Sequence, residues 1–216
     1  MKVALTFDAE HPDRPNCAPG TADAILDALA ERAVRATFFM QGRWVEAYPA
    51  TARRAARDGH LVASHSHHHA PMPLLGSDGV LRDVRAAERA IEAVTGADPR
   101  PWFRCPWGLG WDDPVVLDAL AHAGYRHAGW NVEVHDWEPS RSPDHISDDV
   151  VRGVLHPRSA ATEEETIVLL HSWPEQNREA VPAIVDALLA AGAEFVGVDD
   201  LRTITVEAIE SWDGAP

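Results

Sequence analysis

Short strand-like runs alternate with longer alanine-rich segments along the whole of this chain. The segments between the strand-like runs carry apolar residues at helical spacing. The clearest expected strands are the runs 2–7, 37–40, 61–64 and 166–170. Strands that alternate with helices predict parallel βαβ units, because a parallel neighbour requires a crossover connection. We therefore expect an α/β fold.

The remaining expected elements continue this alternation. Further strands are expected over 102–104, 125–132 and 195–198. Helices are expected from Thr21 onward and over 44–58, 77–93, 114–123, 148–155 and 178–191. With about seven such units, a barrel of parallel strands is favoured over an open doubly wound sheet. Because chemistry in such barrels gathers at the C-terminal ends of the strands, polar residues that directly follow strands are the candidates for a site.

The length of the chain limits the number of domains, and its net charge limits the classes of molecule that it can bind. The chain has 216 residues, which suits a single catalytic domain over 1–216 rather than two domains. Its formal net charge of −15 argues against nucleic acid as a partner, because phosphate backbones bind through clusters of Lys and Arg. No apolar run approaches the ~20 residues that a membrane-spanning helix requires. We expect a small-molecule or oligosaccharide substrate, and the oligomeric state stays open.

The compartment is inferred from the first residues and the cysteines. The chain opens without an apolar stretch of signal-peptide length, so we expect a cytoplasmic protein, although a chain trimmed at its start would leave a secreted parent open. Two cysteines, Cys17 and Cys105, are too few for a disulfide framework. Reduced thiols are the preferred interpretation, and a single bridge between the two stays open.

Two groups of candidate residues follow early strands. Asp8 and Glu10 come directly after the first strand, and side chains two apart on an extended chain point to the same face. The two carboxylates can therefore converge on one site, the alternative being a solvated acidic loop. His65 and His69 lie in a run of histidines after the third strand. On a helical turn their spacing would place both imidazoles on one face, which suits two ligands of one metal.

Two more groups follow later strands. Arg104 stands at a strand end beside a Pro-Trp-Gly turn, where a guanidinium can hold a carboxylate and a backbone N–H of the turn can face a reacting oxygen. Ordinary surface packing is the alternative for this arginine. His171 ends the most apolar strand. It is either a core histidine or, if paired with a carboxylate such as Asp136, a general acid with a raised pKa.

Taken in order, these segments resemble the motifs of the polysaccharide deacetylases, carbohydrate esterase family 4. The resemblance extends from Thr6 to His171 and rests on Thr6-Phe7-Asp8, His65-Ser66-x-x-His69, Arg104-x-Pro106-Trp107-Gly108, Asp136-Trp137 and Leu169-x-His171. It implies a distorted (β/α) barrel that hydrolyses the N-acetyl group of an amino sugar or oligosaccharide, releasing acetate and a free amine. It also implies a divalent metal, usually zinc, with Co²⁺, Ni²⁺ or Mn²⁺ as alternatives.

The resemblance also implies a role for each matching residue. The residues that carry the reaction would be Asp8 as the base, Arg104 as the group that orients it, His171 as the general acid and Asp136 as the carboxylate that tunes this acid. The residues that bind metal and substrate would be His65 and His69 as ligands, with Trp107 and Trp137 as walls of the acetyl and sugar pocket. Trp111, Trp130 and Trp173 also lie near motif loops and can line a pocket for sugar rings.

One position departs from the family pattern. Ala9 stands where members usually have an aspartate as the third metal ligand, and an alanine cannot bind a metal. Glu10 is the nearest replacement, and His11 is a second candidate. The arrangement of Asp8 and Glu10 is similar to that in divergent members, some of which act on small or lipid-linked substrates.

Two other functions therefore compete with N-deacetylation of an amino sugar. One is a C–N hydrolase of the same superfamily that acts on a small non-sugar or lipid-linked amide, as a deformylase or a ureide or imide hydrolase does. The other is a non-catalytic sugar-binding domain that has lost its metal. The presence of Asp8, Arg104, Asp136 and His171 argues against a binding domain, because a binder needs neither a base nor an acid.

Overall fold

The computed structural model describes residues 1–10, 18–157 and 165–202. Its strands are β1 Lys2–Ala9, β2 Thr37–Met40, β3 Leu61–Ser64, β4 Trp102–Phe103, β5 Arg126–His127, β6 Val132–Glu133, β7 Glu165–His171 and β8 Glu194–Phe195. They form one sheet in the order β5-β4-β3-β2-β1-β7-β6, and β8 pairs with the first residues of β1. Every strand pair is parallel, as expected for βαβ units.

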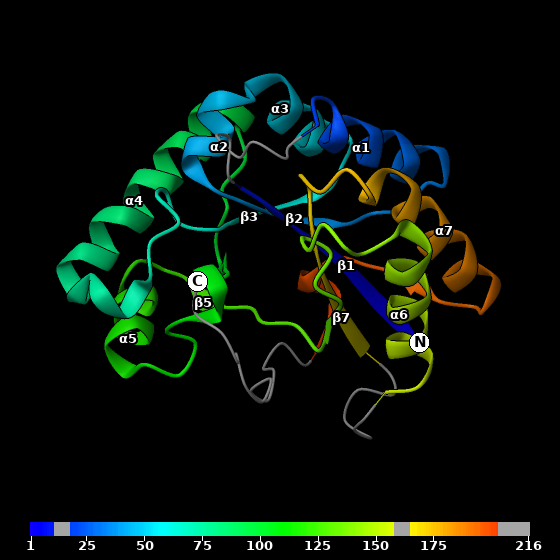
Figure 1. The fold of residues 1–216 in the computed structure, drawn as a ribbon. Helices are drawn as coiled ribbons and strands as arrows, with labels where there is room; N and C mark the ends of the chain where they lie inside the picture. Colours follow the sequence, from blue (N-terminus) through cyan, green and yellow to red (C-terminus); the bar gives the residue numbers. More distant parts are fainter. Residues whose placement is uncertain (11–17, 158–164, 203–216) are drawn as a thin grey trace.

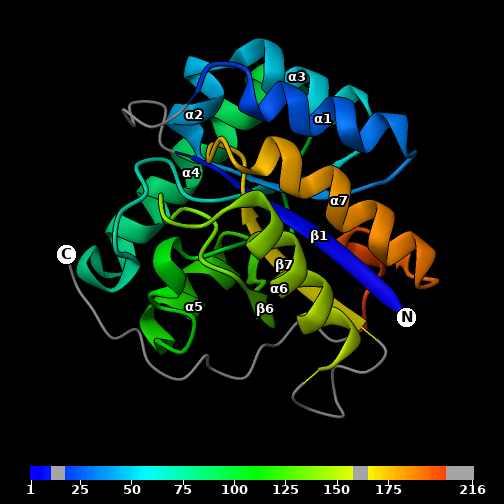
Figure 2. The ribbon, with the colours of Figure 1, turned by 45° about the vertical axis from the view of Figure 1, so that its right-hand side comes forward.

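The sheet curls into a distorted barrel with helices on its outside (Figure 1). The helices are α1 Thr21–Glu31, α2 Gly42–Ala47, α3 Pro49–Arg57, α4 Gly76–Thr95, α5 Pro114–His122, α6 Pro143–Leu155 and α7 Asn177–Ala190. Helices α6, α7, α1, α3, α4 and α5 pack against one another in this order around the sheet, and α2 packs on α4 (Figures 1 and 2). Within the described residues β5 and β6 do not pair, so the barrel is open between these two strands. The expected barrel of parallel strands is confirmed.

The central strand β1 shows how the sequence directs side chains to the two faces of the sheet. Val3, Leu5 and Phe7 pack into a large cluster with the apolar faces of the surrounding helices. Ala4 lies in a second cluster inside the barrel. Because side chains alternate along a strand, Asp8 shares the inner face with Ala4. The last inner position of β1 is therefore polar, although the strand is buried over Val3–Ala9.

The segment 44–58 was expected to form one helix, and this is wrong. The chain forms α2 and α3 instead, with a break at Tyr48, whose backbone has φ −123° and ψ 56°. The next residue is Pro49, which has no N–H to donate and disfavours the helical region for the residue before it. The proline thus ends one helix and supplies the first residue of the next.

The expected strand over 125–132 is also wrong, because the chain changes partner within it. β5 pairs with β4 at one edge of the sheet, whereas β6 pairs with β7 at the other. Between them the carbonyl oxygens of Ala128 and Gly129 accept hydrogen bonds from the Arg104 guanidinium at 3.3 and 3.0 Å. A buried side chain therefore occupies these acceptors, which a continuous strand would offer to a neighbour.

Two other boundaries differ from expectation. Helix α6 begins at Pro143 rather than at 148, because the Ser142 hydroxyl accepts from the backbone N–H of His145 and proline is tolerated at the first helical position. The last strand is shorter than 195–198, since Val198–Asp200 forms a 3₁₀ turn. In the part of the chain that the structure describes, no helix combines the length and apolar character that crossing a membrane would require.

Candidate active site

The candidate residues gather at the C-terminal ends of the parallel strands. Strands β1, β3 and β7 run in the same direction, so their ends meet at one edge of the sheet. The expected site residues Asp8, Glu10, His65, His69, Arg104, Asp136 and His171 are all buried there. The distances below show which of them are in contact. His11, the second candidate for the third ligand, and Cys17 lie outside the described residues, whereas Cys105 is buried.

Glu10, His65 and His69 form a cluster of metal-ligand type. One ligand atom from each lies within 4.8 Å of the other two. His65 Nε2 lies 3.1 Å from Glu10 Oε2 and 3.1 Å from His69 Nε2, and His69 Nε2 is in close contact with the same carboxylate oxygen. Two imidazole nitrogens and a carboxylate oxygen are a common donor set for a catalytic zinc. The residues present therefore fit a divalent cation.

Two nearby carboxylates, those of Asp8 and Glu10, affect the pKa of His65. Burial lowers the pKa of this imidazole, but the carboxylates of Asp8 and Glu10 outweigh burial and leave the pKa of His65 raised. Its other ring nitrogen, Nδ1, lies 2.9 Å from the Arg104 carbonyl oxygen. That carbonyl can accept the Nδ1–H, which leaves Nε2 as the nitrogen available to a metal.

The loop that carries the two histidines is not the expected helical turn. Ser66 and His69 both have positive φ, of 62° and 57°. The carboxylate of Asp83, on α4, holds the loop. It accepts hydrogen bonds from the backbone N–H groups of His67 and His68 at 2.7 and 3.1 Å. The imidazoles of His65 and His69 therefore converge through an irregular turn that a buried carboxylate supports.

Arg104 is fully buried and pairs with Asp8. Its Nη1 donates to Asp8 Oδ1 at 2.8 Å and to the Thr6 hydroxyl at 2.8 Å, while its guanidinium carbon Cζ lies 4.0 Å from the centre of the Phe39 ring. Asp8 Oδ2 lies 3.5 Å from His65 Nε2. The arginine thus holds one oxygen of Asp8 and leaves the other directed at the cluster. Burial lowers the pKa of Arg104, and Asp8 opposes this.

His171 also borders the cluster and forms a second pair, with Asp136. Its Nδ1 is 2.8 Å from Asp136 Oδ1, and its backbone N–H donates to Asp136 Oδ2 at 2.7 Å. The Asn177 amide, at the start of α7, donates to both Asp136 and the His171 carbonyl. Burial by itself lowers the pKa of His171, but Asp136 above all, with Glu10 and Asp8, outweighs burial, and the pKa is raised to about 9. His171 Nε2 is directed inward, 3.8 Å from Glu10 Oε1.

Two of the expected aromatic walls border these groups. The Trp107 ring is 4.3 Å from the His69 ring, and Trp107 is half exposed in a turn where its own φ is 52°. The Trp137 ring is 5.1 Å from the His171 ring and also stacks on the His135 ring. One indole therefore flanks the metal-type cluster, and the other flanks His171.

Two residues that support the site, Asp83 and Asn177, were not among the candidates expected from the sequence. Asp83 occupies a position in the buried stripe of α4 between Val80 and Val84. A charged residue in such a stripe is a signal, because burying a carboxylate is unfavourable without partners. Asn177 is fully buried in the first turn of its helix. Nothing in its sequence context distinguishes it from an ordinary polar residue near a helix start.

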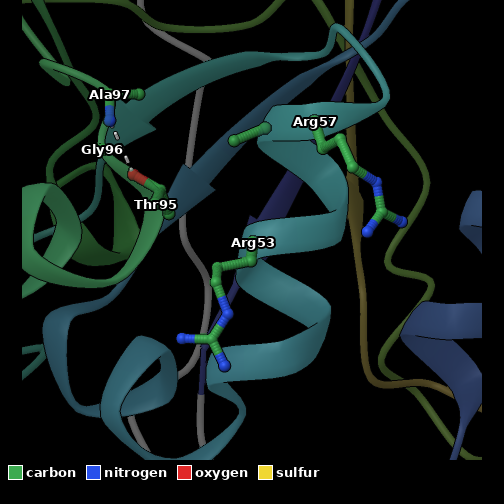
Figure 3. A pocket seen from close by; sticks show the side chains of 6 residues that line it. Arg53, Arg57, Thr95, Gly96 and Ala97 are labelled. Atoms are coloured by element: carbon green, nitrogen blue, oxygen red, sulfur yellow. Dashed lines mark hydrogen bonds between the residues drawn. The ribbon is translucent and has the colours of Figure 1, made fainter.

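A separate hollow lies between the C-terminal ends of α3 and α4 (Figure 3). It is lined by Arg53, Ala56, Arg57, Thr95, Gly96 and Ala97. These helix ends lead into the N-terminal ends of β3 and β4, so the hollow lies at the opposite end of the sheet from the candidate site. Its lining residues include no carboxylate, histidine or cysteine.

Comparison with known families gives a match over more than half of the chain. Residues 1–128 match the family model described as polysaccharide deacetylase. A chitooligosaccharide deacetylase from Sinorhizobium fredii is 36% identical over 196 residues, which cover 90% of this chain and 83% of that protein. A peptidoglycan-N-acetylmuramic acid deacetylase from Bacillus subtilis is 26% identical, over 92% of this chain and 70% of that protein.

Solved structures show the same fold. A family 4 carbohydrate esterase from Streptomyces lividans, in complex with acetate, has a TM-score of 0.75 and 28% identity, over 90% of this chain and 91% of that one. A pseudoenzyme of carbohydrate esterase family 4 from Bacillus anthracis has a TM-score of 0.79 and 26% identity. The match covers 93% of this chain but 64% of the pseudoenzyme, so the present chain spans less than two thirds of that protein's length.

Proposed function

The chain belongs to the polysaccharide deacetylase family, and on this premise we propose that it hydrolyses the N-acetyl group of an amino sugar in an oligosaccharide or glycan. The products are acetate and a free amine. The observation that carries the proposal is that the Glu10–His65–His69 cluster borders two further pairs: Asp8–Arg104, through His65, and His171–Asp136, through Glu10. A base and an acid that both border a metal-type cluster suit amide hydrolysis.

The reaction needs a proton removed from water and a proton given to the leaving amine. Asp8 Oδ2, left open by the arginine, accepts the proton of the attacking water as the C–O bond forms. His171 Nε2 donates its proton to the amine as the C–N bond breaks, because an amine anion does not leave at neutral pH. We assign the role of donor to the oxyanion to the backbone N–H of Trp107, whose turn borders the cluster through its indole. Glu10, His65 and His69 would hold the divalent cation, zinc in this proposal, which as a Lewis acid polarises the substrate carbonyl.

The product distinguishes this function from its nearest rival. We expect the purified protein to release acetate from N-acetylglucosamine oligomers, measured with a coupled acetate assay. The departure at Ala9 and Glu10 favours the rival, a C–N hydrolase of small amides. Release of formate or ammonia from small amides, with no acetate from the oligomers, would contradict the proposed substrate.

Metal content tests the third alternative, a sugar-binding domain without catalysis. We expect a stoichiometric divalent metal in the purified protein, because three buried ligand atoms already face one another. Removal with a chelator is expected to stop acetate release, and added Zn²⁺ or Co²⁺ to restore it. A protein that binds the oligomers but takes up no metal would contradict the proposed activity.

The pH profile of acetate release is expected to depend on Asp136. The acid must carry its proton, so activity falls as pH rises through the pKa of His171, which is raised to about 9, with Asp136 as the largest of the raising causes. Asp136→Asn removes the charge but keeps the side-chain size. We expect the alkaline limb of kcat to move to lower pH by about 1–3 units, the usual effect of one neighbouring charge. An unchanged alkaline limb would remove Asp136 from this role. Asp83→Asn, which removes a carboxylate supporting the other side of the site, is the matched control and should leave that limb in place.

A further inference from the structure

The two carboxylate oxygens of Glu10 have different surroundings. Oε2 faces the two imidazoles, 3.1 Å from His65 Nε2 and in close contact with His69. Oε1 is directed away from these two imidazoles: the Trp173 indole N–H donates to it at 3.3 Å, and His171 Nε2 lies farther from it, at 3.8 Å. Both residues are buried, with Glu10 at 3% and Trp173 at 5% exposure. The carboxylate is therefore held in one orientation between the histidines and the indole.

The strand register explains why these two residues meet. β1 and β7 are parallel and pair Asp8 with His171 at their ends. The ladder continues one step further, because the Ser172 N–H donates to the Asp8 carbonyl oxygen at 3.1 Å. Glu10 and Trp173 each lie two residues beyond the last pair, so they share the face of Asp8 and His171. Ala9, one residue earlier, packs with the outer core instead.

We infer that Trp173 is a positioning residue for the metal site, whose indole N–H orients Glu10 so that Oε2 joins the two histidines as the third ligand. The inference rests on the metal site in the proposed function. It gives a reason why a glutamate at position 10 can replace a ligand that is usually supplied from position 9. The longer side chain has a partner, the Trp173 indole, that fixes the carboxylate oxygen not facing the histidines, Oε1. Partners that orient a ligand typically contribute 10- to 100-fold in metal affinity.

The test is the affinity of the metal-free full chain for Zn²⁺, measured by competition with a chromophoric chelator. Trp173→Phe keeps an aromatic ring but removes the N–H donor. We expect Zn²⁺ binding to weaken by about 10- to 100-fold. Trp44→Phe is the matched control, because Trp44 is equally buried, at 4%, but packs in the outer core. Its Zn²⁺ affinity should equal that of the wild type, and thermal unfolding of each metal-free variant reports any loss of packing.

A double-mutant cycle separates orientation of Glu10 from general packing. If Trp173 acts through Glu10, Trp173→Phe costs no further affinity in a Glu10→Ala background. The same additional loss in that background, or wild-type affinity in Trp173→Phe, would overturn the inference, as would wild-type affinity in Glu10→Ala alone. Should the phenylalanine variant not fold, Trp173→Met also removes the donor with an adaptable side chain, and the same loss is expected.

Because the test measures Zn²⁺ affinity and not catalysis, the inference and the proposed function can fail separately. A wild-type chain that binds Zn²⁺ but releases no acetate would refute the proposed function and leave the affinities to decide the role of Trp173. A chain that releases acetate while Trp173→Phe keeps full affinity would refute this inference and leave the proposed function in place.

Discussion

Replacing His171 with alanine is expected to lower kcat for acetate release by about 10²- to 10⁴-fold, the usual contribution of a positioned general acid. The amine would then leave without a proton donor at the place where His171 Nε2 faces the cluster. The loss should shrink for an acetate ester of similar shape, because an alcohol leaves more readily than an amine. Initial rates on both substrates, at equal metal loading, measure the difference.

The control for this variant is its metal content. His171 is not one of the three clustered ligand residues, so His171→Ala should bind Zn²⁺ stoichiometrically, as the wild type does. A folded, metal-loaded variant whose turnover on the amide stays near that of the wild type would remove His171 from the role of acid. Equal losses on amide and ester would also contradict protonation of the leaving group.

Replacing Arg104 with methionine is expected to lower the free energy of unfolding by about 3–5 kcal/mol, the usual effect of breaking a buried ion pair. Arg104 is fully buried and Asp8 is 4% exposed, so the carboxylate would lose its cation in a place that is largely shielded from bulk water. The variant would also lose the donors to Ala128 and Gly129. Urea unfolding followed by circular dichroism measures the change.

Two comparisons sharpen this prediction. Arg126→Met makes the same substitution at the exposed residue of β5, where the guanidinium lies 5.0 Å from the centre of the Trp102 ring, and is expected to change stability by no more than about 1 kcal/mol. Asp8→Asn added to Arg104→Met removes the unpaired charge and should recover part of the lost stability. An Arg104→Met protein that unfolds at the same urea concentration as Arg126→Met would show that the pair is not stabilising.

Much of the fold could be predicted from the sequence, because apolar periodicity and local breakers act over a few residues. The strands 37–40 and 61–64 have the expected bounds, and the long helix α4 ends at Gly96, whose φ of 72° suits glycine. The boundaries that were predicted wrongly have two kinds of cause: a neighbouring residue in the sequence, or a residue far away along the chain. Pro49 divides α2 from α3 by a local rule that the apolar pattern obscured, whereas the break between β5 and β6 depends on a residue more than 20 positions away, Arg104.

The order of residues along the chain shows which polar groups follow which strands, and so which side chains can reach one edge of the sheet. It also indicates that Asp8 and Glu10 share a face, because that follows from the period of an extended chain. How these groups are held in place depends on the folded arrangement. Three hydrogen bonds support the site: Asp83 accepts from the loop that carries the histidines, Asn177 donates to Asp136, and Trp173 donates to Glu10. Their contacts join segments whose distance in space depends on strand register and helix packing, and no local pattern encodes such contacts.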